Sequence, residues 1–167
     1  MSPRLVTVLF SAILSLAIVV CGSRDTRPRH ADPRMVGKNP DYDEKLATTL
    51  HSDEYGMSRY VVAFLKVGPN QGQDSLTAAK LQQAHLKNIQ RMADEGKLVL
   101  AGPFLDEGEI RGIYVFDAAS IEEAKQLTET DPAVPAGRLI VELHPWYGSA
   151  ALKRVNAMHK ALAKKAF

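Results

Sequence analysis

The chain has 167 residues, of which 46% are hydrophobic and 24% are charged, and its formal net charge is +2. These values are ordinary for a globular protein, and the length allows one domain with a modest extension. Because the net charge is small and no basic run is interleaved with aromatic residues, nucleic acid is excluded as an expected partner.

Residues 1–22 have the pattern of an export signal. Met1–Arg4 is a short basic start, and Leu5–Val20 is uncharged and almost wholly apolar. This run is shorter than the roughly 20 residues that cross a membrane, and it matches the apolar part of a secretory signal. We therefore expect an exported protein that is periplasmic, anchored in the membrane as a lipoprotein, or secreted.

Cys21 is the only cysteine, and it leaves three ways of processing this signal open. The first is lipidation of Cys21, although Val20 stands where a lipoprotein signal has a smaller residue. The second is cleavage after Gly22, and the third is an uncleaved anchor. None of them allows a disulfide within the chain, so stability is expected to come from packing.

Residues 23–57 are expected to join the export signal to the folded domain. Ser23–Asn39 is rich in arginine and proline, which is typical of a flexible tether. In the second half of the segment Tyr42, Leu46 and Leu50 recur every four residues, which predicts a short helix lying against the domain.

Residues 58–148 are predicted to form an α+β domain in the order strand–helix–strand–strand–helix–strand (βαββαβ). Short apolar runs rich in β-forming residues indicate the strands. This order is that of the ferredoxin-like fold, whose four strands form one antiparallel sheet. The predicted strands are Tyr60–Lys66, Lys97–Ala101, Ile110–Phe116 and Leu139–Leu143.

The ends of the two helices carry capping signals. Asp74 or Ser75 can cap the first helix, which Gly96 should end after about Glu95. The second helix is predicted over Ser120–Thr130 and begins with capping-box spacing. Two helices cover only one face of the sheet, so the other face needs a cover.

Residues 149–167 offer one such cover. Leu152, Val155, His159 and Leu162 share one helical face, and basic residues mark the rest of the tail. We expect a basic amphipathic helix packed on the domain or across a dimer, and attachment to an anionic membrane surface is the alternative.

His85 is the first candidate for chemistry. It shares a helical stripe with Leu81, Ile89 and Met92, so its imidazole should face the sheet. It is either a general acid or base that works near neutral pH or a half-buried histidine bonded to a backbone carbonyl.

Asp131 is the second candidate, at the end of the second predicted helix. Pro132 biases it away from helical dihedral angles, so Asp131 can simply end the helix. The alternative is that its carboxylate orients the imidazole of His85 and stabilises the imidazolium.

Four further residues, Gly102, Pro103, Phe104 and Trp146, are candidates for ligand binding. Gly102 would allow a ligand or a neighbouring strand to come close, and Pro103 fixes the turn after it. Trp146 could line a pocket or a subunit interface, or belong to the core. The 5 histidines are scattered, and no metal-ligand spacing or dinucleotide fingerprint occurs, so neither a metal nor a cofactor is expected.

Together, His85, Gly102–Pro103 and Asp131–Pro132 resemble the YCII-related family over the region Tyr60–Tyr147. The resemblance implies a dimeric α/β barrel, in which the sheet of a second subunit covers the open face of the first. It also implies that His85 and Asp131 form the site, because a His–Asp pair has been suggested as the site in that family.

Two classes of function remain open. The wider superfamily of this fold includes muconolactone isomerases and chloromuconolactone dehalogenases. A cofactor-free isomerase, lyase or dehalogenase acting on a small organic acid or ring compound is therefore implied, with proton transfer by His85. The alternative is a non-catalytic module that binds a small ligand or associates with the cell envelope.

Overall fold

The structure is a computed structural model that describes residues 37 and 39–165. The folded unit is Asn39–Phe167. The predicted export signal with Cys21, and nearly all of the predicted tether, lie outside the described residues. Within the described ranges, no helix is both long enough and apolar enough to cross a bilayer.

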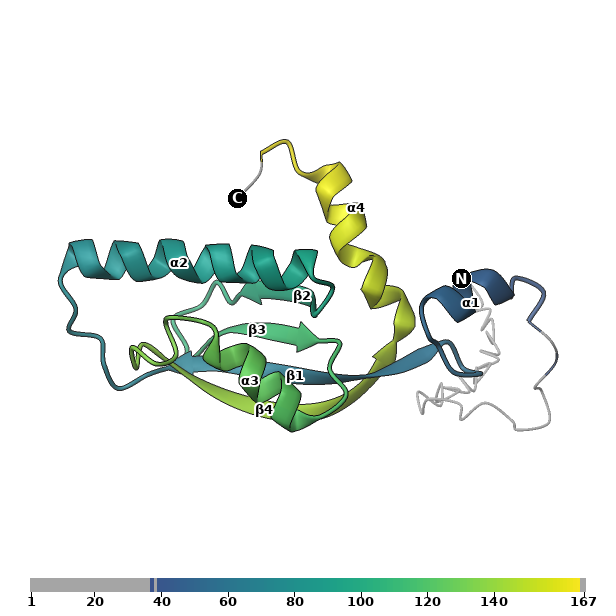
Figure 1. Ribbon diagram of the computed structural model, residues 1–167, viewed down its shortest axis with the longest axis horizontal. Helices are drawn as coiled ribbons and strands as arrows, with labels where there is room; N and C mark the ends of the chain where they lie inside the picture. Colours follow the sequence, from purple (N-terminus) through teal and green to yellow (C-terminus); the bar gives the residue numbers. More distant parts are fainter. Residues whose placement is uncertain (1–36, 38, 166–167) are drawn as a thin grey trace, which may run out of the picture. The chain divides into compact units, whose positions relative to one another are not determined.

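The chain has the predicted βαββαβ order, with a short helix before it and a helical segment after it (Figure 1). Helix η2 is a 3₁₀ helix, and it leads directly into the last α-helix. The elements are α1 (Glu44–Thr49), β1 (Met57–Val67), α2 (Ser75–Asp94), β2 (Leu98–Pro103), β3 (Ile110–Phe116), α3 (Ile121–Glu129), β4 (Leu139–Ser149), η2 (Ala150–Arg154) and α4 (Val155–Leu162).

The four strands form one antiparallel sheet in the order β2-β3-β1-β4, which confirms the α+β, ferredoxin-like prediction. β1 pairs with β4 from Met57 opposite Ser149 to Val67 opposite Leu139. On its other side β1 pairs with β3, where the register shifts between Leu65 and Lys66. The end of β1 therefore lies between the starts of β3 and β4.

The predicted helix ends are confirmed. The side chain of Asp74 accepts hydrogen bonds from the amides of Leu76 and Thr77 at the start of α2. Gly96 has φ +73° just after the end of that helix, a conformation that glycine adopts without strain. At the start of α3, Ser120 accepts a hydrogen bond from the amide of Glu123.

The prediction that the last strand ends at Leu143 is wrong, because β4 continues to Ser149. Pro145 lies within β4 opposite Val61. A proline cannot donate a ladder hydrogen bond, but an edge strand has one side without a partner and tolerates it. Since β4 is at the edge of the sheet, the strand passes through Pro145.

The C-terminal tail and α1 bury fewer of their apolar residues than the helical patterns in the sequence predicted. Leu152 packs on the sheet from η2, but Leu162 is 78% exposed at the end of α4. Helix α1 begins only after its cap residue Asp43, so Tyr42 lies outside the helix. Leu50, which follows the last residue of α1, is buried. The tail therefore covers only part of the second sheet face.

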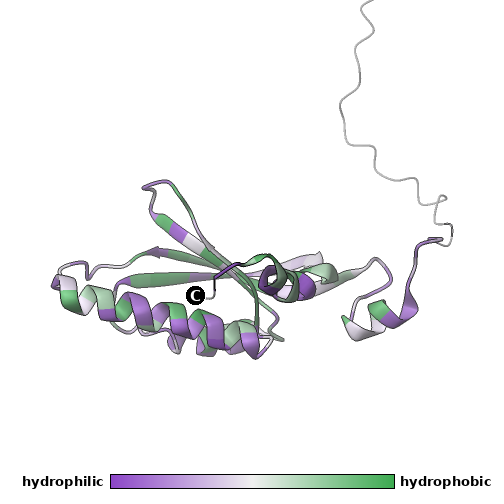
Figure 2. Ribbon diagram, turned by 90° about the horizontal axis from the view of Figure 1, so that it is seen from above, coloured by the Kyte–Doolittle hydropathy of each residue, from purple (hydrophilic) through white to green (hydrophobic). Residues whose placement is uncertain are grey.

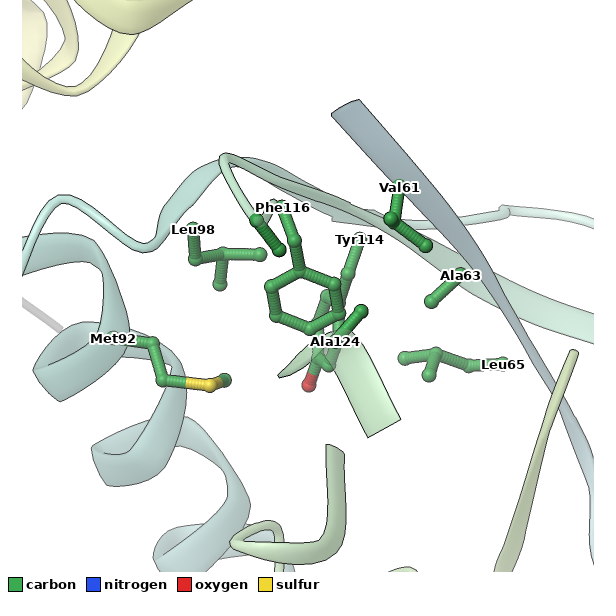
Figure 3. Packing of buried hydrophobic residues seen from close by; sticks show 9 residues of the cluster. Val61, Ala63, Leu65, Met92, Leu98, Tyr114, Phe116 and Ala124 are labelled. Carbon is green, nitrogen blue, oxygen red and sulfur yellow. The ribbon is translucent and has the colours of Figure 1, made fainter. Parts of the chain in front are cut away.

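The main core lies between the sheet and the helices α2 and α3. Figure 3 shows Met92 reaching from its helix toward Phe116 and Tyr114 of β3, with Ala124 of α3 nearby. The opposite face has a smaller cluster that includes Tyr60, to which Leu152 of η2 contributes. Both predicted helices thus pack on the same face, the one that carries the candidate site.

Candidate active site

The side chains of His85, from α2, and Asp131, from the turn after α3, contact each other between the helices and the sheet. Nδ1 of His85 lies 2.6 Å from Oδ2 of Asp131, and the imidazole is 14% exposed while the carboxylate is fully buried. The pairing predicted from the sequence is therefore present. The partner of the imidazole is this carboxylate, not the backbone carbonyl considered as the alternative.

Asp131 also shapes the turn after α3. Its Oδ1 accepts a hydrogen bond of 3.0 Å from the amide of Ala133, while its other oxygen is bonded to His85. The two alternatives for Asp131, a turn residue and an orienting carboxylate, are thus combined in one side chain. The turn holds the carboxylate in position, and so it fixes the ring of His85.

Tyr114 is the member of this cluster that sequence reasoning missed. From the middle of β3 its hydroxyl donates a hydrogen bond of 3.0 Å to Oδ2 of Asp131, and its ring stacks on the His85 ring with centroids 6.2 Å apart. A buried tyrosine usually needs a partner for its hydroxyl. Tyr114 stands in a strand that was predicted to be buried, so its need for a hydrogen-bond partner could have pointed to this cluster.

The environment fixes the protonation of these side chains. Burial raises the pKa of Asp131, but the hydrogen bond and charge of His85, with the bonds from Ala133 and Tyr114, outweigh it and hold the pKa below its usual value. Burial, together with the charge of Asp131, raises the pKa of Tyr114. At neutral pH the carboxylate is therefore ionised and the phenol protonated. Nδ1 of His85 then carries a proton toward Asp131, and Nε2 is the nitrogen left for a ligand.

His85 lines a cavity of about 630 Å³, a size typical of small-molecule sites. The cavity wall as a whole is largely apolar. It includes Leu81 and Ile89 from α2, and Tyr114 contributes from the sheet. Gly102 and Pro103, both predicted to bind a ligand, also line it.

Gly102 was predicted to let a neighbouring strand come close, but the glycine that permits this is Gly112. A Cβ atom at Gly102 would meet no other atom within 4 Å. At Gly112 of β3, a Cβ atom would lie 2.6 Å from the carbonyl oxygen of Gly102. Gly112 therefore permits the close packing of β2 and β3 at the cavity wall, and sequence reasoning did not single it out.

Phe104 and Trp146 are not brought into this cavity. Phe104 follows β2 and is 47% exposed. Trp146 lies on the opposite face of the sheet, where its ring is 5.8 Å from that of Tyr60, and it lines a separate, open hollow with Asp53 and Arg59. Phe104 and Trp146 thus lie on surfaces other than the cavity that His85 lines.

The part of the chain that the structure describes contains no group of three or more His, Cys, Asp or Glu side chains placed to hold a metal ion. The chemistry available at the cavity from the chain itself is proton transfer by an imidazole, with a carboxylate and a phenol behind it.

Comparison with known proteins gives one family. Residues 62–147 match the model of the YCII-related domain. The uncharacterized protein YjpA of Bacillus subtilis (strain 168) is 34% identical over 62 residues, which cover 37% of this chain and 71% of YjpA. A solved structure, 5-chloro-2-hydroxyhydroquinone dehydrochlorinase (TftG) from Burkholderia phenoliruptrix AC1100 with 2,5-dihydroxybenzoquinone, matches 53% of this chain and 93% of its own, with 21% identity and a TM-score of 0.40.

Proposed function

This chain belongs to the family of YCII-related domains, and we propose that it is a cofactor-independent enzyme in which His85 moves a proton on a small organic acid or ring compound. One observation carries the proposal. A buried, ionised Asp131 lies 2.6 Å from Nδ1 of His85, and the same histidine lines a cavity of about 630 Å³.

The proposed chemistry begins at Nε2. With Nδ1–H held by Asp131, Nε2 of the neutral ring takes a proton from a carbon next to a carbonyl group, and the electron pair of the broken C–H bond moves into an enolate. Asp131 stabilises the imidazolium that forms. Returning the proton to another carbon gives an isomerisation, and departure of a leaving group instead gives an elimination. Tyr114 takes a positioning role through its bond to Asp131.

An unbiased screen tests this proposal. The protein is incubated in D₂O with a collection of small organic acids, lactones and hydroxylated ring compounds, and proton NMR follows the loss of C–H signals or the formation of new products. We expect exchange or turnover of at least one compound. Compounds that bind but show neither reaction would favour the alternative function, a binding module, which the largely apolar cavity wall also suits.

We also propose a homodimer in which the sheets face one another. The sheet face away from α2 and α3 carries half-buried Phe64 and Ile113, and Ile140 on it is 50% exposed. The strands are among the most hydrophobic parts of the ribbon in Figure 2. Apolar burial contributes about 25 cal/mol per Å², so covering this face favours association.

Sedimentation of residues 39–167 should therefore give a dimer at micromolar concentration. Ile140→Glu should weaken the dimer by at least roughly 10-fold, because it places a charge in the interface. Leu105→Glu, at a loop residue that is 98% exposed, is the matched control and should have no effect. A monomer at high concentration would contradict the proposal and leave the C-terminal segment as the cover of this face.

Export is a separate proposal, which the pattern of residues 1–22 supports. We expect a mature protein that begins between Cys21 and Ser23, found in the envelope or outside the cell. Mass spectrometry of membrane, soluble envelope and cytosolic fractions measures this. A diacylglyceryl mass on Cys21 would identify a membrane-anchored lipoprotein, whereas a cytosolic protein that retains Met1 would contradict export.

A further inference from the structure

We infer that the cavity beside His85 selects anionic ligands, with an apolar body and a carboxylate or similar group, and that Arg111 and Arg138 hold the anionic group. The inference rests on the proposed function for the place of the site and adds the charge of the substrate and the residues that select it. The two arginines were not singled out in the sequence, and neither has a part in the proton transfer.

The charged residues that line the cavity are basic. Arg111, Arg138 and His85 line it, and among residues 39–165 no aspartate or glutamate does. Asp131 is fully buried, and Oδ2 of its carboxylate is taken up by His85 and Tyr114. An anion in the cavity would therefore lie beside two arginines, with no carboxylate of a described residue on the wall to oppose it.

The topology brings the two arginines to one end of the sheet. Arg111 lies in β3 where the register against β1 shifts, between Gly112 opposite Leu65 and Ile110 opposite Lys66. Arg138 immediately precedes Leu139, which pairs with the last residue of β1. Both arginines thus lie near the C-terminal end of β1, at the same end of the sheet, and both line the cavity.

Neither arginine has its charge neutralised within the described residues. Arg138 donates a hydrogen bond of 2.7 Å to Oε1 of Gln73, a neutral partner that orients the guanidinium without cancelling its charge. The ion pairs formed among residues 39–165 involve other cations and leave out both Arg111 and Arg138. Guanidinium groups bind carboxylates in a planar, two-bonded geometry, so an anionic ligand would complete this end of the cavity.

The rest of the wall suits an apolar body. Leu81, Leu86 and Ile89 line the cavity from α2, the helix that also carries His85. A ligand anchored by its anionic end at the arginines would lay its body along this wall and present a carbon to Nε2 of His85.

The test is a comparison of acids with their uncharged amides. Calorimetric titration of the full chain is carried out with benzoate and benzamide, 2-naphthoate and 2-naphthamide, and hexanoate and hexanamide. We expect at least one acid to bind about 10-fold or more tightly than its amide. Arg111→Gln and Arg138→Gln should each lower the affinity for that acid severalfold and leave the amide unaffected, while Arg138→Lys should restore part of the loss.

Controls separate this inference from the proposed function. Arg154→Gln removes a positive charge from an exposed position in η2 and should leave the acid-to-amide ratio unchanged. His85→Asn should keep a preference for acids even where proton transfer is lost. Acid preference without any proton transfer in the D₂O screen would defeat the proposed function and leave this inference standing.

Three results would overturn the inference. The first is an amide that binds as tightly as its acid in every pair. The second is an acid preference that survives in both arginine-to-glutamine variants or is lost equally in Arg154→Gln. The third is the absence of binding by any of the acids below about 10 mM.

Discussion

Replacing Asp131 by alanine should lower the free energy of unfolding by about 3 kcal/mol. The carboxylate is fully buried and accepts hydrogen bonds from the ring of His85, the hydroxyl of Tyr114 and the amide of Ala133. Without it, these donors stay buried without their partner, and a cavity replaces the carboxyl group. Urea unfolding followed by circular dichroism measures the loss.

Glu107→Ala is the control for this prediction. Glu107 is exposed in the loop between β2 and β3, and the free energy of unfolding should change by less than about 0.5 kcal/mol. A similarly small change on Asp131→Ala would show that the buried cluster contributes little to the fold.

The Asp131 contribution should depend on pH in a defined direction. The pKa of Asp131 is lower in the folded protein than its usual value, so its stabilising effect is present above the unfolded pKa of about 3.9. That effect is lost as the pH falls from there through the folded pKa. The difference in stability between the natural protein and Asp131→Asn should therefore shrink only in this acid range, and shrinkage beginning near neutral pH would contradict the assignment.

Replacing His85 by asparagine should lower the rate of proton transfer by about 10²–10⁴-fold. The amide of asparagine can still donate toward Asp131, but Nε2 is removed. We therefore expect the rate to fall while the free energy of unfolding changes by about 1 kcal/mol or less. The rate is measured with a compound that reacts in the D₂O screen.

His144→Asn is the matched control, since it removes a histidine outside the cavity. His144 lies in β4, and its Nε2 is 2.8 Å from Oε1 of Glu142. Its replacement should leave the rate within about twofold of the natural protein, because it does not touch the reacting groups. If His85→Asn kept the full rate, or unfolded the protein while ligand binding persisted, His85 would have a structural role.

The fold was predictable because its signals are local. Asp74 and Ser120 cap the helices where expected, and Gly96 turns the chain into β2 through its left-handed conformation. The apolar pattern of α2 predicted that His85 faces the sheet, and Pro132 predicted that Asp131 lies where α3 ends. Since both helices pack on one face of this fold, the pairing of the two residues could be anticipated.

The missed residues depend on strand register, which the sequence does not display. Tyr114 joins the site because the register of β3 against β1 points it toward the helices, and Gly112 matters because β2 approaches it closely. Arg111 and Arg138 reach the same end of the sheet only through the pairing of β1 with both neighbours. The length of β4 was misjudged for the same reason, because only its edge position allows Pro145.

The nitrogen NMR spectrum of the His85 ring reports on its role as the acid–base group. We expect that Nδ1 carries a proton bound toward Asp131, that Nε2 is the nitrogen that gains and loses one, and that a ligand from the screen shifts the Nε2 resonance. Asp131→Asn should change the Nδ1 resonance. A ring protonated only on Nε2, or one whose resonances do not move when a reacting compound binds, would contradict the assignment of His85 as the acid–base group.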